Sequence, residues 1–338
     1  MRFTIPLLLI IFCFISLSLF ASPKYKIVDL EIPNVRNSSD ATSINDKGQI
    51  CGTYNNENEP RIFFWDPHTG FRDIGINARW GNPIINNNGI IVGNSYLRND
   101  KGANIGNSIF LWDKKNGLSD MGWQSDKYQS LLDFNNLNHI LFIHQNEKNE
   151  SSLYVCFSSL GALFSDARIN DDSKIFGSKL TQNGMFLGLF DLKTGNYEDV
   201  FFFKGSCTMR GFNNQGVAIG DLETSYQNHY GFIWSKEKGL ELFDTFLPIC
   251  INDVGQIVGY EVDINHRRMK NPFHDPLLLT LLDKGEKINI NQNLELEFDP
   301  STPWSCISQI FDINNNGQIV GRAFKAGSSH AILLDPIK

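Results

Sequence analysis

One short stretch of sequence recurs along the chain and decides the fold. It reads Ile44-Asn45-Asp46-Lys47-Gly48-Gln49-Ile50-Cys51-Gly52, and it returns as Ile85-Asn86-Asn87-Asn88-Gly89-Ile90-Ile91-Val92-Gly93. Further copies lead with Asn213, Asn252 and Asn314, and two divergent copies lead with Asn135 and Asn170. The seven lead asparagines are 41, 49, 35, 43, 39 and 62 residues apart. Self-similarity at such a period is typical of repeat architectures, so we count seven units.

A second motif follows the first in four of the units. The runs Phe63-Phe64-Trp65, Phe110-Leu111-Trp112 and Phe232-Ile233-Trp234 lead to Gly70, Gly117 and Gly239, and Phe190 leads to Gly195. The distance from the last aromatic residue to the glycine is five residues in each case. A fixed distance that ends in glycine is typical of a tight hairpin whose backbone needs a positive φ. Each unit is therefore predicted to hold four short strands, and no segment has helical periodicity.

Four strands in each of seven units predict an all-β protein, a β-propeller of seven four-stranded blades. The alternative is a β-solenoid, which the repeat spacings of 35 to 62 residues fit poorly. The last unit ends at Ala331-Ile332-Leu333-Leu334 and lacks a fourth strand, whereas an unmatched strand stands at Tyr25-Lys26-Ile27-Val28-Asp29-Leu30. We expect this N-terminal strand to complete the last blade, because that pairing closes the ring and protects both sheet edges.

The ends and the composition of the chain indicate where the protein is located. Residues 1–21 combine Arg2 with an apolar run and end on Ala21, which predicts a signal peptide followed by one domain over residues 22–338. An uncleaved anchor is the alternative. The 338 residues carry a net charge of −7, which argues against a nucleic-acid-binding protein. We expect a secreted, periplasmic or cell-envelope protein with no membrane span after signal cleavage.

The units resemble the HAF-repeat family of bacterial extracellular proteins, named for a His-Ala-Phe strand start. The segment His330-Ala331-Ile332 comes closest to that start, and His229-Tyr230-Gly231-Phe232 is a looser copy. The Ile-Asn-x-x-Gly-x-Ile-Val-Gly core also matches, and the similarity extends over residues 25–338. The resemblance implies secretion and a repeat architecture, and it implies no activity.

The sequence holds few signs of catalysis or metal binding. The spacing Asp312-x-Asn314-x-Asn316-Gly317 imitates the start of a calcium-binding loop, but Ala323 stands where that loop needs a glutamate. The motif is therefore interpreted as a hairpin turn in which Asn caps local amides. Asp73 and Asp120 could form a carboxylate pair, but they are repeat-equivalent and are expected in different blades. We expect no metal, no cofactor and no enzyme activity.

The variable connections between strands carry the candidate binding residues. Successive strands of a blade reverse direction, so the two kinds of tight turn share one face and the two variable connections share the other. Large aromatic and basic side chains on variable loops are typical of recognition surfaces. These candidates are Arg79, Trp80, Trp123, Lys204, Phe246, His266, Arg267, Arg268 and Trp304. The alternative interpretation places the tryptophans between blades and the arginine pair in a solvated loop.

The sequence thus predicts a secreted, non-enzymatic repeat protein that binds a surface glycan or a protein through this variable-loop face. One alternative is a carbohydrate-active hydrolase or lyase that uses a carboxylate pair near the central channel. Another is a structural component of the cell envelope.

Overall fold

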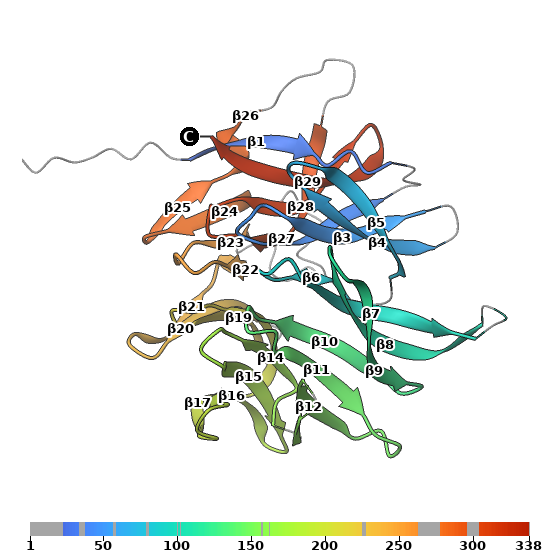
Figure 1. Cartoon of the computed structure of the whole chain (residues 1–338). Helices are drawn as coiled ribbons and strands as arrows, with labels where there is room; N and C mark the ends of the chain where they lie inside the picture. The colour runs from blue at the N-terminus through green and yellow to red at the C-terminus, as the bar shows by residue number, and fades with distance from the viewer. Residues whose placement is uncertain are drawn as a thin grey trace, which may run out of the picture.

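Seven small antiparallel sheets surround a common centre in the computed structural model (Figure 1). The structure describes residues 23–33, 38–56, 59–78, 81–99, 101, 103–156, 158–161, 163–224, 228–262, 278–295 and 304–337. The prediction of an all-β, seven-bladed propeller is confirmed. The predicted signal peptide, residues 1–21, lies outside the described residues. No helix within the described part of the chain is long and apolar enough to span a membrane.

Each of the first three blades is a simple meander of four strands in chain order. Blade 1 consists of β2 (Ser39–Ile44), β3 (Ile50–Asn55), β4 (Pro60–Asp66) and β5 (Gly70–Asn77). Blade 2 consists of β6 (Ile84–Ile85), β7 (Ile91–Arg98), β8 (Asn104–Asp113) and β9 (Gly117–Ser125). Blade 3 consists of β10 (Gln129–Phe134), β11 (Ile140–Gln145), β12 (Ser151–Val155) and β13 (Ser158–Gly161).

The next three blades have the same strand order. Blade 4 consists of β14 (Asp166–Ile169), β15 (Lys174–Thr181), β16 (Gly184–Asp191) and β17 (Tyr197–Phe203). Blade 5 consists of β18 (Gly205–Phe212), β19 (Val217–Thr224), β20 (His229–Ser235) and β21 (Gly239–Phe243). Blade 6 consists of β22 (Phe246–Ile251), β23 (Ile257–Glu261), β24 (Leu278–Asp283) and β25 (Glu286–Asn289).

The seventh blade joins the two ends of the chain, as predicted. It contains β27 (Trp304–Ile313), β28 (Ile319–Lys325) and β29 (Ser328–Ile337), and its fourth strand is β1 (Lys24–Asp29). β1 pairs antiparallel with β29 along its whole length, and the short β26 (Leu294–Glu295), which follows the 3-10 turn η1 (Asn291–Asn293), pairs with its other edge. Figure 1 shows the blue β1 beside the red β29.

The repeat motif has a local physical explanation in each blade. The Asn-x-x-Gly turn links the first and second strands, and Gly48 has a φ of 72°, in the left-handed region that favours glycine. Asn138, at the same place in blade 3, adopts a φ of 65°. In blades 1, 2 and 5 the last glycine of the motif makes room for a phenylalanine of the third strand: a Cβ atom on Gly52 would lie 2.7 Å from the Phe63 ring. In these blades the turn and the buried ring together hold the inner strands in register.

Candidate functional site

A closed ring of asparagine side chains joins all seven blades at one end of the central channel. The Nδ2 group of each lead asparagine donates a hydrogen bond of 2.8 to 3.2 Å to the backbone oxygen of the next blade's lead asparagine. The ring runs through Asn45, Asn86, Asn135, Asn170, Asn213, Asn252 and Asn314 and returns to Asn45. All seven side chains are buried. The blades are therefore linked by directed polar contacts as well as by packing.

A second ring is formed by the residues that follow the lead asparagines. The backbone N–H of each donates to the Oδ1 atom of its counterpart in the next blade, over 2.7 to 2.8 Å. Its members are Asp46, Asn87, Asn136, Asp171, Asn214, Asp253 and Asn315. We call the two rings together the amide belt.

The amide belt explains which residue types the repeat uses. A lead asparagine must donate to the neighbouring blade while its Oδ1 accepts from its own turn, as Asn45 does from the N–H groups of Lys47 and Gln49. Only an amide side chain provides both a donor and an acceptor there. A second-ring residue must accept an N–H on its Oδ1 atom, which Asn and Asp can both do. The asparagines of this ring also donate from Nδ2 to a neighbouring aspartate, as Asn214 does to Asp171 and Asp253. The local capping by Asn was predicted, whereas the links between blades were not.

The central channel beside the belt encloses a cavity of about 360 Å³. Its wall is formed by the innermost strand of every blade. Four charged side chains line it just before the lead asparagines: Asp133 of β10, Arg168 of β14, Arg210 of β18 and Asp312 of β27. At the same positions the other blades carry uncharged residues, such as Thr42 and Ile84. The cavity therefore has a charged wall that differs from blade to blade.

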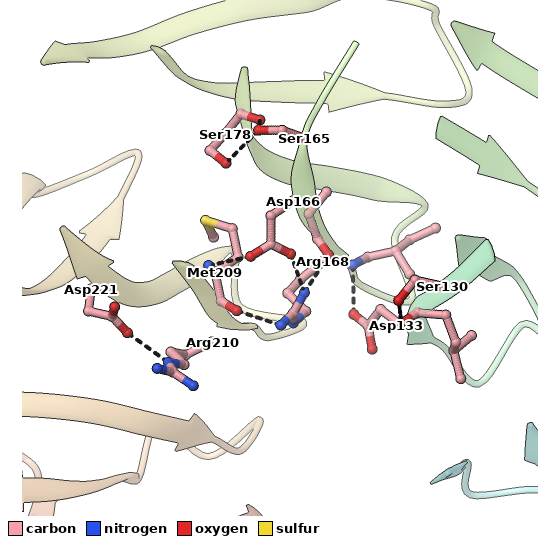
Figure 2. Close-up of polar contacts among 12 residues, drawn as sticks. Ser130, Asp133, Ser165, Asp166, Arg168, Ser178, Met209, Arg210 and Asp221 are labelled. Atoms are coloured by element: carbon pink, nitrogen blue, oxygen red, sulfur yellow. Dashed lines mark hydrogen bonds and ion pairs between the residues drawn. The ribbon is translucent and has the colours of Figure 1, made fainter. Parts of the chain in front are cut away.

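Arg210 is the inserted residue of a β-bulge. The register between β18 and β19 shifts between Met209 and Gly211, so Arg210 has no partner residue in the ladder. Bulges re-aim a side chain, and Arg210 is among the residues that line the channel cavity. Its Nε atom donates to Asp221 Oδ1 over 2.7 Å (Figure 2). Among the described residues, no hydrogen bond engages its two terminal nitrogens, so they can bind a planar anion such as a carboxylate.

Arg168 is held in place more completely. Its Nη1 atom donates to Asp166 Oδ1 over 3.0 Å, and its Nη2 atom donates to the backbone oxygen of Met209 in blade 5. The other oxygen of Asp166 accepts from the Met209 N–H over 2.8 Å, as Figure 2 shows. This pair fastens blade 4 to blade 5. Arg168 therefore contributes a fixed positive charge to the channel.

The two channel aspartates are positioned by the blade that follows each of them. Asp133 Oδ2 accepts from the Ile169 N–H over 2.8 Å. Asp312 Oδ2 accepts from the Ile44 N–H and the Ser43 hydroxyl over 3.0 and 2.9 Å. These contacts fix the orientation of both carboxyl groups and leave room for further hydrogen bonds on their oxygens.

Burial gives both channel aspartates a raised pKa. Burial raises the pKa of Asp312 to about 6, although its hydrogen bonds oppose the shift, and the charge of Asp133 contributes to the increase. Burial also raises the pKa of Asp133, and the positive charge of Arg168 counteracts part of that effect. The two carboxyl groups therefore have different surroundings, one beside an arginine and one away from it, and such a difference is how a protein separates an acid from a base.

Three of the predicted binding residues, Lys204, Phe246 and Trp304, have described side chains, and none of the three lines the channel cavity. Phe246 is 0% exposed and packs between blades, so the expectation that it binds a ligand at the surface is corrected. Its position, six residues before a lead asparagine, fills the wedge between blades. Trp304 packs against His330 and Lys325, and Lys204 is exposed between β17 and β18. Trp123 belongs to β9, but its side chain is outside the described part. Arg79, Trp80, His266, Arg267 and Arg268 also lie outside the described residues.

Sequence reasoning missed the channel residues as a group. The signal was available: Asp133, Arg168, Arg210 and Asp312 are charged at repeat positions where most copies are uncharged. Asp312 was noticed only as part of a calcium-like spacing. The carboxylate candidates Asp73 and Asp120 lie on the outer strands β5 and β9 of different blades, as expected, and Asp73 pairs with Arg61 over 2.8 Å.

In the described part of the chain, no three His, Cys, Asp or Glu residues are grouped so as to hold a metal ion. The channel residues do not fit a metal site, and we derive no step through a metal.

The chain is similar to known proteins in its fold but not in its sequence. A scan of protein-family models and a search of curated proteins give no match. Among solved structures, an oligogalacturonate lyase in complex with manganese has a TM-score of 0.58 and 11% identity, over 92% of this chain and 93% of the lyase. The β-propeller domain of the Trilobed protease from Pyrococcus furiosus has a TM-score of 0.51 and 16% identity, over 74% and 80% of the two chains. A puromycin-hydrolyzing peptidase from Mycobacterium tuberculosis has a TM-score of 0.56 and 9% identity, over 89% of this chain and 53% of the peptidase.

These comparisons contradict the expectation that the chain is not an enzyme. The lyase and the peptidase named above are enzymes, and the lyase matches this chain over nearly its whole length. The expectation rested on the absence of contiguous catalytic motifs. A propeller instead assembles a site from one side chain per blade, so catalytic residues can be far apart in the sequence. At such low sequence identity, the structural similarity shows only the fold of this chain. A particular activity can only be proposed. The HAF-repeat resemblance stays a prediction.

Proposed function

We propose that the protein is a carbohydrate-active lyase that cleaves an oligosaccharide of uronic acids in its central channel. The observation that carries the proposal is the meeting of two carboxyl groups and an incompletely paired arginine around one cavity: Asp133, Asp312 and Arg210. A cavity of about 360 Å³ falls within the usual range for small-ligand sites. A cavity of this size fits the end of a sugar chain rather than the middle of a long polymer.

The chemistry follows from the roles of these three side chains. Elimination removes the proton at C5 of a uronate, forms the C4–C5 double bond and breaks the bond between C4 and the glycosidic oxygen. Arg210 would bind the uronate carboxylate through two parallel N–H···O bonds and stabilise the charge that develops there. Asp133, beside Arg168, would accept the C5 proton, and Asp312 would donate a proton to the departing oxygen. The electron pair of the broken C–O bond leaves with that oxygen, so atoms and charges balance.

The lyase likeness supports this proposal in a limited way. The oligogalacturonate lyase aligns with this chain over 93% of its own length, at a TM-score of 0.58. The alternative, hydrolysis, would use the same two carboxyl groups with water, but it gives Arg210 no role. Export through residues 1–21 would place such an enzyme where extracellular oligosaccharides are found, and this remains part of the proposal.

We expect the protein to convert oligogalacturonate to an unsaturated product, measured as ultraviolet absorbance of the new double bond. Asp312→Asn should lower kcat by about 10²- to 10⁴-fold, because an amide cannot donate an acidic proton. Arg210→Gln should lower kcat/KM by roughly 10²-fold, through a higher KM and a lower kcat, because Arg210 both binds the carboxylate and stabilises the developing charge. Asp73→Asn is the matched control, an acid-to-amide change outside the channel, and should leave activity unchanged. New reducing ends without unsaturation would identify a hydrolase, and inactivity on acidic and neutral oligosaccharides would refute the proposal.

The pH dependence of kcat/KM provides a separate prediction. Asp312 must carry its proton to act as the acid, so the rate should fall tenfold per pH unit above about pH 6, where the raised pKa of Asp312 lies. Asp133 must be ionised to act as the base, and the rate should also fall on acidification. A pH–rate profile measured from pH 4 to 9 should therefore be bell-shaped. A rate that is constant from pH 6 to 9 would exclude Asp312 as the acid.

A further inference from the structure

Within the described part of the chain, the side chain of Arg210 forms a hydrogen bond with one residue, Asp221. The Arg210 Nε atom donates to Asp221 Oδ1 over 2.7 Å (Figure 2). Arg210 is the bulged residue of β18, whereas Asp221 belongs to β19, the second strand of the same blade. The guanidinium of a residue that lines the channel cavity is therefore held from a neighbouring strand.

The place of Asp221 in the repeat has another use in two other blades. Asp221 directly follows the last glycine of the motif, and Asn94 and Tyr260 have the same place in blades 2 and 6. Asn94 Oδ1 accepts the N–H of Leu131 in the next blade over 3.3 Å. The Tyr260 hydroxyl accepts the N–H of Ile310 in its next blade over 2.9 Å. In these two blades the side chain at this place links one blade to the next.

Blade 5 cannot form this link, because the next blade has no donor at the corresponding position. Leu131 and Ile310 each lie four residues before a lead asparagine, and the corresponding residue of blade 6 is Pro248. Proline has no backbone N–H. The Asp221 carboxylate binds Arg210 instead. An acidic residue at this place is therefore explained by the arginine and not by the contact between blades.

The bond to Nε determines which edge of Arg210 is left for a ligand. A guanidinium presents its donors along two kinds of edge, one that includes Nε and one formed by the two terminal nitrogens. Because Asp221 accepts from Nε, the edge of the two terminal nitrogens is left, and a carboxylate can bind it through two parallel hydrogen bonds. An anchored side chain also loses less conformational freedom when it binds a ligand.

We propose that Asp221 is a positioning residue, which orients Arg210 so that its two terminal nitrogens bind a uronate carboxylate in the channel. This inference rests on the proposed function, because it concerns the same site. Asp221 acts only through Arg210, so its effect on substrate binding should disappear when Arg210 is replaced.

Two substitutions that share the loss of charge test the proposal. Asp221→Asn and Asp221→Ala both remove the carboxylate, but asparagine keeps an oxygen that can accept from Nε. The dissociation constant for digalacturonate is measured by calorimetry in the Asp312→Asn background, which should bind this sugar without turnover. Asp221→Ala should bind about tenfold more weakly than Asp221→Asn, the usual effect of one hydrogen bond to a charged group. In chains that also carry Arg210→Gln, the two should bind equally.

Blade 1 provides a matched control. Arg61 Nε donates to Asp73 Oδ2 over 2.8 Å, so Asp73→Ala removes the same kind of contact away from the channel. A loss of binding caused by weaker blade packing in general would also appear in this variant. We expect Asp73→Ala to leave the dissociation constant for digalacturonate unchanged.

The outcomes separate this inference from the proposed function. If Arg210→Gln weakens binding but Asp221→Ala and Asp221→Asn bind equally well, the positioning role is wrong and the proposed site stands. An Asp221→Ala defect that persists in the Arg210→Gln chain would also overturn the positioning role. If digalacturonate does not bind, or if Arg210→Gln leaves its binding unchanged, the proposed function is wrong and the role of Asp221 is overturned with it.

Discussion

Replacing Asn252 with Asp should lower the free energy of unfolding by about 3 to 5 kcal/mol, the usual cost of an uncompensated buried charge. The Asn252 Nδ2 group donates to the Asn314 backbone oxygen over 2.9 Å and to Gln256 Oε1 over 2.8 Å. A carboxylate would put a negatively charged oxygen against two acceptors in a buried site. The loss should appear as a lower midpoint in urea unfolding, with an unchanged slope.

The adjacent residue provides the matched control. Asp253 belongs to the second ring, where its Oδ1 accepts the Asn214 N–H and its Oδ2 accepts from Asn214 Nδ2, both over 2.8 Å. Asparagine retains the first acceptor and loses the second, while Asn214 Nδ2 keeps its bond to Asp171. Asp253→Asn should therefore cost about 1 to 2 kcal/mol, less than Asn252→Asp. The loss of stability caused by Asn252→Asp should also be smaller at low pH. A buried carboxyl group has a raised pKa in the folded protein, and its protonated form can donate a hydrogen bond. Equal effects of the two exchanges would mean that the closed ring contributes little to stability.

Deletion of residues 23–30 should abolish cooperative folding. These residues include β1, whose six residues all pair with β29, and they bury Tyr25, Ile27 and Leu30. Without β1 the edge of β29 is exposed and blade 7 has three main strands, so the ring is open. We expect a loss of the single unfolding transition in calorimetry, together with aggregation.

Two comparisons separate ring closure from a general effect of truncation. Removal of residues 1–22 alone should leave the melting temperature unchanged, because the closing strand remains. A synthetic peptide of residues 23–33, added in excess to the shortened protein, should restore the transition by pairing with β29. A shortened protein that melts like the full chain would show that closure by β1 is dispensable.

The fold could be predicted because every blade is built from the same local contacts. The Asn-x-x-Gly turn, the Val-Gly pair and the aromatic strand are set by contacts within one blade, so a motif of nine residues is enough to reveal them. The closing strand was also predictable, since the last unit lacks a strand that the N-terminus supplies. Links between blades were harder to predict, because a side chain such as Asn45 reaches a backbone oxygen 41 residues away.

The candidate site could not be predicted as a site, for a related reason. Asp133 and Asp312 are far apart in sequence and meet only because the ring closes. The residues chosen from the sequence were selected by side-chain type and loop position, and Phe246 shows the weakness of that choice: an aromatic side chain at the start of an inner strand packs between blades. Charge at a repeat position that is normally uncharged is the better signal, since it departs from what the fold requires.

The most direct test of the account is a crystal structure of the Asp312→Asn variant soaked with an oligogalacturonate. We predict that the sugar lies in the central channel, with its carboxylate bound to the terminal nitrogens of Arg210 and its C5 atom facing Asp133. The variant is chosen because it should bind the substrate without turning it over. Density for the sugar on the variable-loop face, with the channel empty of it, would contradict the account and return the candidate site to the residues around Trp304.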